Sequence, residues 1–334
     1  MPKCGSSALQ TYLSSPDFGQ VTQGRCAYLA LKDDGRVLSG ETLLHQARLS
    51  PYGYAASVRA NAVAAFDPQQ MSKACASLYQ LGEKHDWLVL SCEAWGPAAQ
   101  HFANDGLFAD PAFEIHLLAY VRPQIEWINS AWWQWGAWTH LKPRQWINRE
   151  RKKALWYSLL RQWADKPWVK SLTVRLLDGD IVQDCMSHLG YQVSKQPRIN
   201  QSLPAIVLRL FQRHPHLRPG PHASAIEFVL ARHLNLKTKK TPWIMDPVLT
   251  SELIDFFCED NEKLAQMLSS QQREQLLSDP RWWQADYYQQ RLIDKAFAER
   301  INVNELEQFA VAAIDTINNL ELEVRELRAR LMIS

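Results

Sequence analysis

Three short apolar runs along the chain predict buried β-strands. They span residues 87–91 (WLVLS), 115–121 (IHLLAYV) and 172–177 (LTVRLL). Each run is followed by a stretch with helical spacing of its apolar residues, and strands that alternate with helices are typical of a parallel sheet covered on both faces. We therefore expect an α/β fold with a central parallel sheet flanked by helices. Ligands of such sheets bind beyond the carboxyl ends of the strands, where Glu93, Arg122 and Asp178 lie.

The second half of the chain carries further helical patterns. Asp180, followed three residues later by a glutamine, has the pattern of a capping box that opens a helix ending near Gly190. Residues 249–268 form the clearest long helical pattern. Prolines in residues 214–222, and the composition of residues 236–247, predict two irregular segments.

The C-terminal tail has apolar residues at alternating steps of three and four, which is a coiled-coil heptad pattern. These residues are Val303, Leu306, Ala310, Ala313, Ile317, Leu320, Val324, Leu327 and Leu331. With Val303 at position a, β-branched residues dominate a and leucines dominate d, which favours parallel dimers, and Glu323 and Arg328 have the spacing of an interchain pair. Residues 303–331 thus predict either a homodimer or, because two alanines weaken the middle of the stripe, a helix packed on its own domain.

The composition limits the classes of partner. The 334 residues include 37 basic and 35 acidic side chains, a net charge of +2, so no general attraction for nucleic acid or anionic membranes is expected. No apolar run is long enough to span a membrane, and Met1 is not followed by the pattern of a signal peptide. We expect a cytoplasmic protein in which any anion site is local.

Cysteine and histidine spacing gives no metal signature. The six cysteines show no CxxC or Cys/His ligand spacing, which argues against disulfides and zinc. His214, His216 and His222 lie in a proline-rich loop without an acidic or cysteine partner, so solvated histidines are expected there. We expect no metal in the site.

The first residues of the chain have the composition of an anion-binding loop. Lys3 brings a positive charge, Gly5 allows close approach of the backbone, and Ser6 and Ser7 offer hydroxyls and amides where a helix begins. The stretch is no Walker A loop, because the lysine precedes the glycine and no G-K-[ST] follows. The alternative interpretation is a capped helix without a ligand.

A second candidate anion site lies at the end of the second predicted strand. Arg122 closes this strand, and Ser130 follows eight residues later, about two helical turns along if a helix begins near Gln124. A guanidinium at a strand end and a hydroxyl on the next helix can bind one phosphate. Taken alone, the pair equally fits a solvated arginine and an ordinary helix serine.

Together, the stretch PKxGSSALQ at the start and the R-x7-S spacing at 122–130 resemble the sulfotransferase family, in particular bacterial enzymes that use 3′-phosphoadenosine-5′-phosphosulfate (PAPS). The resemblance implies a P-loop NTPase-like sulfotransferase fold. It also implies that Lys3, Gly5, Ser6 and Ser7 hold the 5′-phosphosulfate, while Arg122 and Ser130 hold the 3′-phosphate. Other similar stretches are SCE (91–93), VRLLDGDIVQDCMSHLG (174–190), NQSLP (200–204) and FFCEDNEKLA (256–265). The implied domains are 1–290, catalytic, and 291–334, a C-terminal helix.

The resemblance also implies roles in catalysis. Sulfuryl transfer needs in-line approach of a hydroxyl, stabilisation of the leaving phosphate and a base for the acceptor proton. We expect Lys3 to stabilise the leaving side and Glu93 to be the base, because related sulfotransferases use Glu or His in a comparable place, with His45 as the reserve candidate. The expected acceptor is a hydroxyl of a carbohydrate or glycolipid.

Two departures from the family keep alternatives open. The family's phosphate loop normally follows a core strand, whereas this sequence begins at the loop, so either the true start lies upstream or a neighbouring strand edge stays open. The last 3′-phosphate contact has only weak candidates, Lys195, Arg198 and Asn200. The alternatives are a non-catalytic sulfotransferase-fold scaffold that oligomerises through its tail, and a P-loop kinase of small molecules.

The tryptophans between residues 127 and 146 allow two interpretations. They are Trp127, Trp132, Trp133, Trp135, Trp138 and Trp146. Trp132, Trp135 and Trp138 recur at helical spacing, which favours core packing for part of the cluster. An aromatic platform for a sugar acceptor is the other interpretation.

Overall fold

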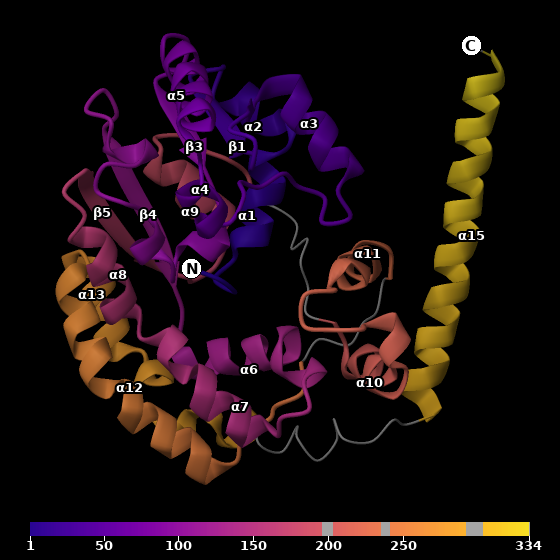
Figure 1. The fold of residues 1–334 in the computed structure, drawn as a ribbon. Helices are drawn as coiled ribbons and strands as arrows, with labels where there is room; N and C mark the ends of the chain where they lie inside the picture. The colour runs from indigo at the N-terminus through magenta and orange to yellow at the C-terminus, as the bar shows by residue number, and fades with distance from the viewer. Residues whose placement is uncertain (196–202, 235–240, 292–302, 334) are drawn as a thin grey trace.

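The computed structural model describes residues 1–195, 203–234, 241–291 and 303–333 (Figure 1). The strands are β1 (Cys26–Leu31), β2 (Val37–Leu38), β3 (Trp87–Leu90), β4 (Ile115–Val121) and β5 (Val169–Leu176). The helices are α1 (Ser6–Leu13), α2 (Pro16–Val21), α3 (Gly40–Leu49), α4 (Ala60–Ala64), α5 (Pro68–Gly82), α6 (Gln124–Gln134), α7 (Pro143–Glu150), α8 (Trp156–Ala164), α9 (Ile181–His188), α10 (Ala205–Arg213), α11 (Ala225–His233), α12 (Pro247–Met267), α13 (Ser270–Ser278) and α15 (Val303–Ile333).

The strands form two small sheets rather than the one central sheet that we expected. One sheet has the order β2-β1-β3, in which β3 is parallel and β2 antiparallel to β1. The other is the parallel pair β4-β5. The mixed α/β class and the three predicted strands are confirmed, whereas β1 and β2 were not predicted.

The two sheets are separated between β3 and β4. Their first residues are close, since the rings of Trp87 and His116 have centroids 5.4 Å apart, yet the two strands share no ladder of hydrogen bonds. Both strands are apolar, but β3 has no buried residue and only the last two residues of β4 are buried. No strand among the described residues lies between these two edges, and this is why the expected sheet is split.

Helices cover both faces of the larger sheet, and alternation along β1 decides which residue faces which layer. Tyr28 and Ala30 pack into a core that contains residues of α1, α3 and α9. Leu29 and Leu31 pack into a second core with residues of α4 and α5. The two-layer covering that we expected of an α/β fold is therefore present around β1.

Below the sheets, α6, α7, α8 and α12 form a helical layer rich in tryptophan. Trp127, Trp132, Trp133 and Trp146 are buried, and the rings of Trp132 and Trp146 meet edge to face with centroids 5.8 Å apart. Core packing is thus confirmed for Trp132 and Trp133, whereas Trp127 and Trp146 are buried and also line the cavity described below. α12, predicted at 249–268, packs against α8 and α6.

The chain after β5 follows its local signals closely. The Asp180 carboxylate accepts hydrogen bonds from the amides of Val182 and Gln183 at 2.9 and 3.3 Å, which caps α9. α9 ends at His188, and Gly190 adopts a left-handed φ of +87° shortly after it, as the sequence predicted. The second half of the expected capping box differs, because the Gln183 side chain donates to the carbonyl of Val193 instead.

The last described element, α15, stands apart from the rest of the molecule except near its first half (Figure 1). The expected domain boundary at 290–291 adjoins residues 292–302, which lie outside the described residues. Among the helices of the described residues, none is long and apolar enough to cross a membrane.

One partly buried charge cluster makes stability depend on pH. Asp184 on α9 accepts a bidentate interaction from Arg175 on β5 and a 2.6 Å hydrogen bond from the Tyr120 hydroxyl. Burial alone would raise the pKa of Asp184, but these hydrogen bonds outweigh it and lower that pKa.

We expect Asp184→Asn to lower the free energy of unfolding by about 1.5–3 kcal/mol at neutral pH, the usual worth of hydrogen bonds to a charged group. Because the folded-state pKa is depressed, this stabilisation is complete above the unfolded pKa of about 3.9 and is lost as pH falls through the folded value. Urea unfolding of both proteins from pH 7 down to pH 2 measures it. A difference that stays constant at the acid end would contradict the assignment.

Candidate functional site

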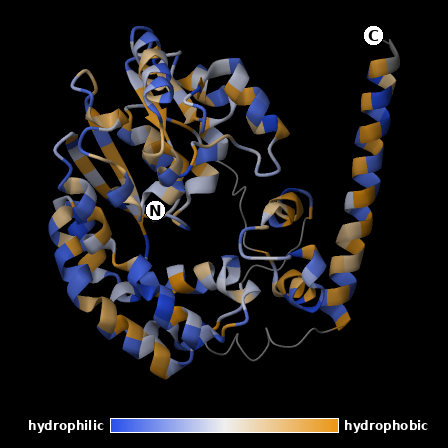
Figure 2. Ribbon diagram, in the orientation of Figure 1, coloured by the Kyte–Doolittle hydropathy of each residue, from blue (hydrophilic) through white to orange (hydrophobic). Residues whose placement is uncertain are grey.

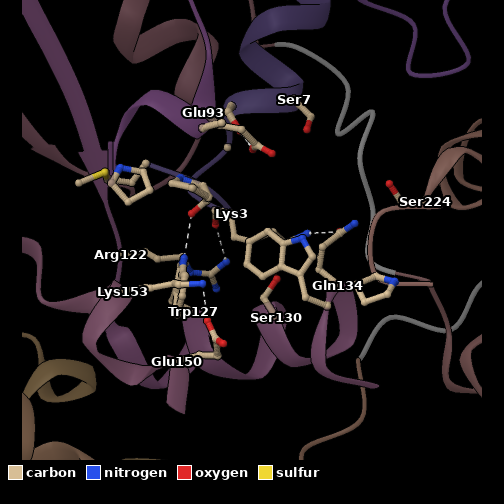
Figure 3. Close-up of a pocket in the computed structure, with 18 of the residues that line it drawn as sticks. Lys3, Ser7, Glu93, Arg122, Trp127, Ser130, Gln134, Glu150, Lys153 and Ser224 are labelled. Atoms are coloured by element: carbon tan, nitrogen blue, oxygen red, sulfur yellow. Dashed lines mark hydrogen bonds and ion pairs between the residues drawn. The ribbon is translucent and has the colours of Figure 1, made fainter. Parts of the chain in front are cut away.

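A large cavity of about 1290 Å³ opens at the carboxyl ends of β3 and β4, between the N-terminal loop and the helices α6, α7 and α11 (Figure 3). Its wall includes the following residues from the two predicted anion sites, together with the predicted base: Lys3, Gly5, Ser6, Ser7, Arg122, Ser130 and Glu93. Lys3 and Arg122 are 119 positions apart in the chain. The fold therefore brings two separately predicted sets of residues to one cavity.

The N-terminal loop has the backbone geometry of an anion-binding turn. Gly5 precedes the first residue of α1 with a left-handed φ of +84°, and Lys3 is also left-handed at +57°. A Cβ on Gly5 would lie 2.7 Å from Cδ1 of Ile181, so a side chain there would clash with α9. The first amides of α1 have no intrahelical partners and form the positive end of the helix dipole.

Contacts from α6 and β4 hold this loop in place. The indole of Trp127 donates to the carbonyl of Pro2 at 2.9 Å, and the guanidinium of Arg122 donates to the carbonyl of Lys3 at 3.4 Å. Cys4, the next residue of the loop, is buried. The loop is thus fixed against the second candidate anion site by direct hydrogen bonds.

Glu93, in the first turn after β3, lies against the loop. Its carboxylate accepts a hydrogen bond of 2.5 Å from the Ser6 hydroxyl. The hydroxyl of Tyr54 lies beside Ser7, and burial, with a smaller effect of the Glu93 charge, raises the pKa of Tyr54 to about 12. Tyr54 therefore stays protonated near neutrality. Glu93 is the acidic side chain that directly contacts a hydroxyl of the loop.

The Lys3 side chain points differently from what the sequence suggested. Its Nζ donates to Oε1 of Gln134 on α6 at 3.0 Å, and Figure 3 shows the two residues on the α6 side of the cavity. Burial lowers the pKa of Lys3, although Glu93 and Glu227 raise it in part. The amine thus faces the cavity interior and is held by an amide, not by the hydroxyls of its own loop.

Arg122 and Ser130 sit where the strand-and-helix spacing predicted. The guanidinium pairs with Glu126, in the first turn of α6, at 2.9 Å, and the carbonyl of Arg122 accepts from the indole of Trp156 at 2.8 Å. The Ser130 hydroxyl makes no hydrogen bond within the described part of the chain. Arg122 is only 24 % exposed, so its charge lies in a partly desolvated wall.

Three further cations of the wall, Arg59, Arg149 and Lys153, were missed from the sequence. Arg149 lies near the end of α7, and Lys153 lies just beyond it. Arg149 pairs with Glu150 at 2.8 Å, and Lys153 forms an ion pair with the same carboxylate. Burial alone would raise the pKa of Glu150, but the hydrogen bonds from both cations outweigh it and lower that pKa. For Arg149 and Lys153 the basic run RERKK was the available signal, and it was not connected with the cavity because only the packing of α7 against α6 places it there.

An aromatic group on the far side of the cavity was missed as well. Tyr52 and Tyr54 follow α3, and Phe228 comes from α11; the Tyr52 and Phe228 rings meet edge to face with centroids 5.0 Å apart. All three are half-buried. The cavity wall therefore has aromatic rings on this side as well as on the α6 side, where Trp127, Trp135 and Trp146 lie beside the cations.

Other predicted residues lie outside this arrangement. His45 is exposed on α3 and does not line the cavity, and Lys195 is exposed. Arg198 and Asn200 lie outside the described residues. Asp178 accepts a hydrogen bond from Gln275 on α13, away from the cavity wall. The described ranges contain no group of three or more His, Cys, Asp or Glu side chains placed to hold a metal.

Comparison with known proteins gives no match to any family model, curated protein or solved structure. The class of protein must therefore be argued from the cavity.

Proposed function

We propose that this protein is a PAPS-dependent sulfotransferase that acts on a hydroxyl of a carbohydrate or glycolipid. The observation that carries the proposal is the meeting of three features in one cavity: a left-handed glycine loop at a helix N-terminus, a strand-end arginine with a helix serine, and a carboxylate at the loop. Each was inferred from a different stretch of sequence.

The charges of the wall support this donor, because PAPS carries anionic groups at both the 5′ and the 3′ position of its ribose. The loop of Lys3, Gly5, Ser6 and Ser7 would hold the 5′-phosphosulfate through helix amides and hydroxyls. Arg122 and Ser130 would hold the 3′-phosphate, and Arg149 and Lys153 add positive charge to the same wall. When bound, PAPS supplies an activated sulfuryl group, which passes to the acceptor hydroxyl with the bisphosphate as leaving group.

The protein's own residues would then position the acceptor and take its proton. Glu93 is the proposed base, since its carboxylate already lies at the hydroxyl of Ser6. Lys3, whose amine is buried and bound to Gln134, is proposed to turn toward the leaving side and stabilise its charge. The half-buried rings of Tyr52, Tyr54 and Phe228 offer apolar surface to a sugar face or a lipid-linked acceptor.

One alternative function is favoured by specific observations, whereas the other, a P-loop kinase, is disfavoured by the order of residues in the loop. A non-catalytic scaffold with this fold is favoured by the divided sheet and by the exposed heptad stripe of α15. A P-loop kinase would need a Walker lysine after the glycines, and the loop has its lysine in front of Gly5.

The first test is equilibrium binding of 3′,5′-adenosine bisphosphate and of ADP to the full chain. We expect the bisphosphate to bind more tightly, because only it can reach both anion sites. Arg122→Gln should weaken its binding about 10- to 100-fold, the loss expected for charge-assisted hydrogen bonds worth 1.5–3 kcal/mol, while affinity for ADP changes little.

His45→Ala is the matched control, since His45 is exposed and off the cavity wall; it should leave both affinities unchanged. Equal binding of ADP and bisphosphate, or ADP binding that depends on Mg²⁺, would favour the kinase. Absence of all nucleotide binding would favour the scaffold.

A further inference from the structure

The C-terminal helix α15 leaves its apolar stripe uncovered. In Figure 2, hydrophobic residues recur along the whole helix, which lies apart from the main body. The exposed members of the heptad stripe, with their exposed fractions, are Val303 (78 %), Leu306 (43 %), Ile317 (67 %), Leu320 (37 %), Val324 (38 %), Leu327 (51 %) and Leu331 (75 %). Side chains of this size that stay exposed in a row mark a contact surface.

The helix touches its own domain with a different face. Phe309 packs against the main core, and the hydroxyl of Thr316 donates to the carbonyl of His233 at 2.9 Å. The half-buried residues of α15 are Glu305, Phe309, Ala312, Ala313 and Thr316, of which only Ala313 belongs to the stripe. The alternative that the helix packs its stripe on its own domain is therefore wrong for the described part of the chain.

Beyond Thr316 the helix has no support from its own domain. Every residue from 317 to 331 is exposed, a length of about 22 Å at the helical rise. Isolated helices of this length are marginal in water, and most helical stability in proteins comes from packing of an apolar face. This segment thus lacks the packing partner that its sequence pattern is suited to.

We propose that the partner is a second copy of this chain, and that residues 303–331 form a parallel two-stranded coiled coil. Ile317 and Val324 occupy position a while Leu320 and Leu327 occupy position d, which is the arrangement that favours parallel dimers. The two alanines fall in the half of the helix that its own domain supports.

The charges flanking this stripe agree with a second identical helix. Glu323 at position g and Arg328 at position e make no ion pair within the described residues, so both are free for an interchain pair. By contrast, Glu321 and Arg325 pair within the helix at 2.8 Å. The proposal does not depend on the proposed sulfotransferase activity.

Sedimentation equilibrium of the full chain and of two leucine variants tests this. We expect the wild type to have twice the 38.5 kDa chain mass at micromolar concentration. Leu320→Glu places a charge at position d and should weaken association at least 100-fold. Leu322→Glu makes the same change at an exposed position f, 50 % exposed, and should leave the dimer intact.

A monomeric wild type at tens of micromolar, a trimer or tetramer, or equal loss of association in both variants would overturn the proposal. Orientation is tested by Glu323→Lys, which should weaken the dimer, and by the double variant Glu323→Lys with Arg328→Glu, which should restore it. Because g pairs with e only between parallel helices, a failure of the double variant to restore association would overturn the parallel arrangement.

Discussion

Replacing Glu93 by Gln should reduce sulfuryl transfer by about 10²- to 10⁴-fold, the usual contribution of a general base. Glutamine has nearly the shape of glutamate and can still hydrogen-bond the Ser6 hydroxyl, so the loop should keep its geometry. It has no basicity with which to accept the proton of the acceptor hydroxyl. We therefore expect turnover to fall while affinity for 3′,5′-adenosine bisphosphate changes by no more than about twofold.

The measurement is transfer of labelled sulfate from PAPS to a panel of oligosaccharides and glycolipids, run beside the bisphosphate binding assay. His45→Ala is the decisive comparison, because His45 was the reserve base and the structure places it on the exposed side of α3. Retained turnover in Glu93→Gln, with loss in His45→Ala, would transfer the role of base to the histidine. A wild type that binds the bisphosphate but transfers nothing would support the scaffold.

The local signals of the sequence predicted those parts of the molecule that short-range chemistry determines. β4 has the predicted bounds, Asp180 caps α9, and α15 is one continuous helix over the heptads. In each case an apolar period or a cap decides the conformation within a few residues. The same holds for the glycine loop before α1 and for the spacing of Arg122 and Ser130.

The parts that failed depend on residues far apart in the chain. β1 and β2 form a hairpin around Asp34 and Gly35, a turn signal that could have been found, but the short run CAYLAL between polar residues was not recognised as a strand. The orientation of the Lys3 amine depends on Gln134, which is 131 positions away. Charge type at a loop can be predicted locally, whereas the direction of a side chain depends on which helix packs beside it.

Adding a strand between the two sheets should make the protein more stable. We expect a five-residue apolar strand such as Ile-Val-Val-Ile-Val, fused ahead of Met1, to raise the free energy of unfolding by about 2–5 kcal/mol. The gain is the burial of the new side chains, about 1.5–3 kcal/mol each, reduced by the entropy of ordering them, about 1–2 kcal/mol per residue or more.

Three observations explain why this position is suited to a strand. The facing edges of β3 and β4 have unpaired backbone groups over apolar residues that are largely half-buried. Met1 lies beside Gly96, just past the carboxyl end of β3, and the carbonyl of Lys3 is bound by Arg122 at the carboxyl end of β4. A segment that precedes Met1 and lies between β3 and β4 would therefore run parallel to both strands. Its backbone could form hydrogen bonds with each of them.

Thermal and urea unfolding of the fusion should be compared with a fusion of Gly-Ser-Gly-Ser-Gly at the same place, which can occupy the space but buries no side chain. We expect only the apolar strand to raise the midpoint, and we expect it also to increase affinity for the bisphosphate, because the loop from Met1 to Gly5 would then be anchored at both ends. Equal stability of the two fusions would mean that the edges of β3 and β4 are closed by side chains such as Trp87 and His116 and do not accept a further strand.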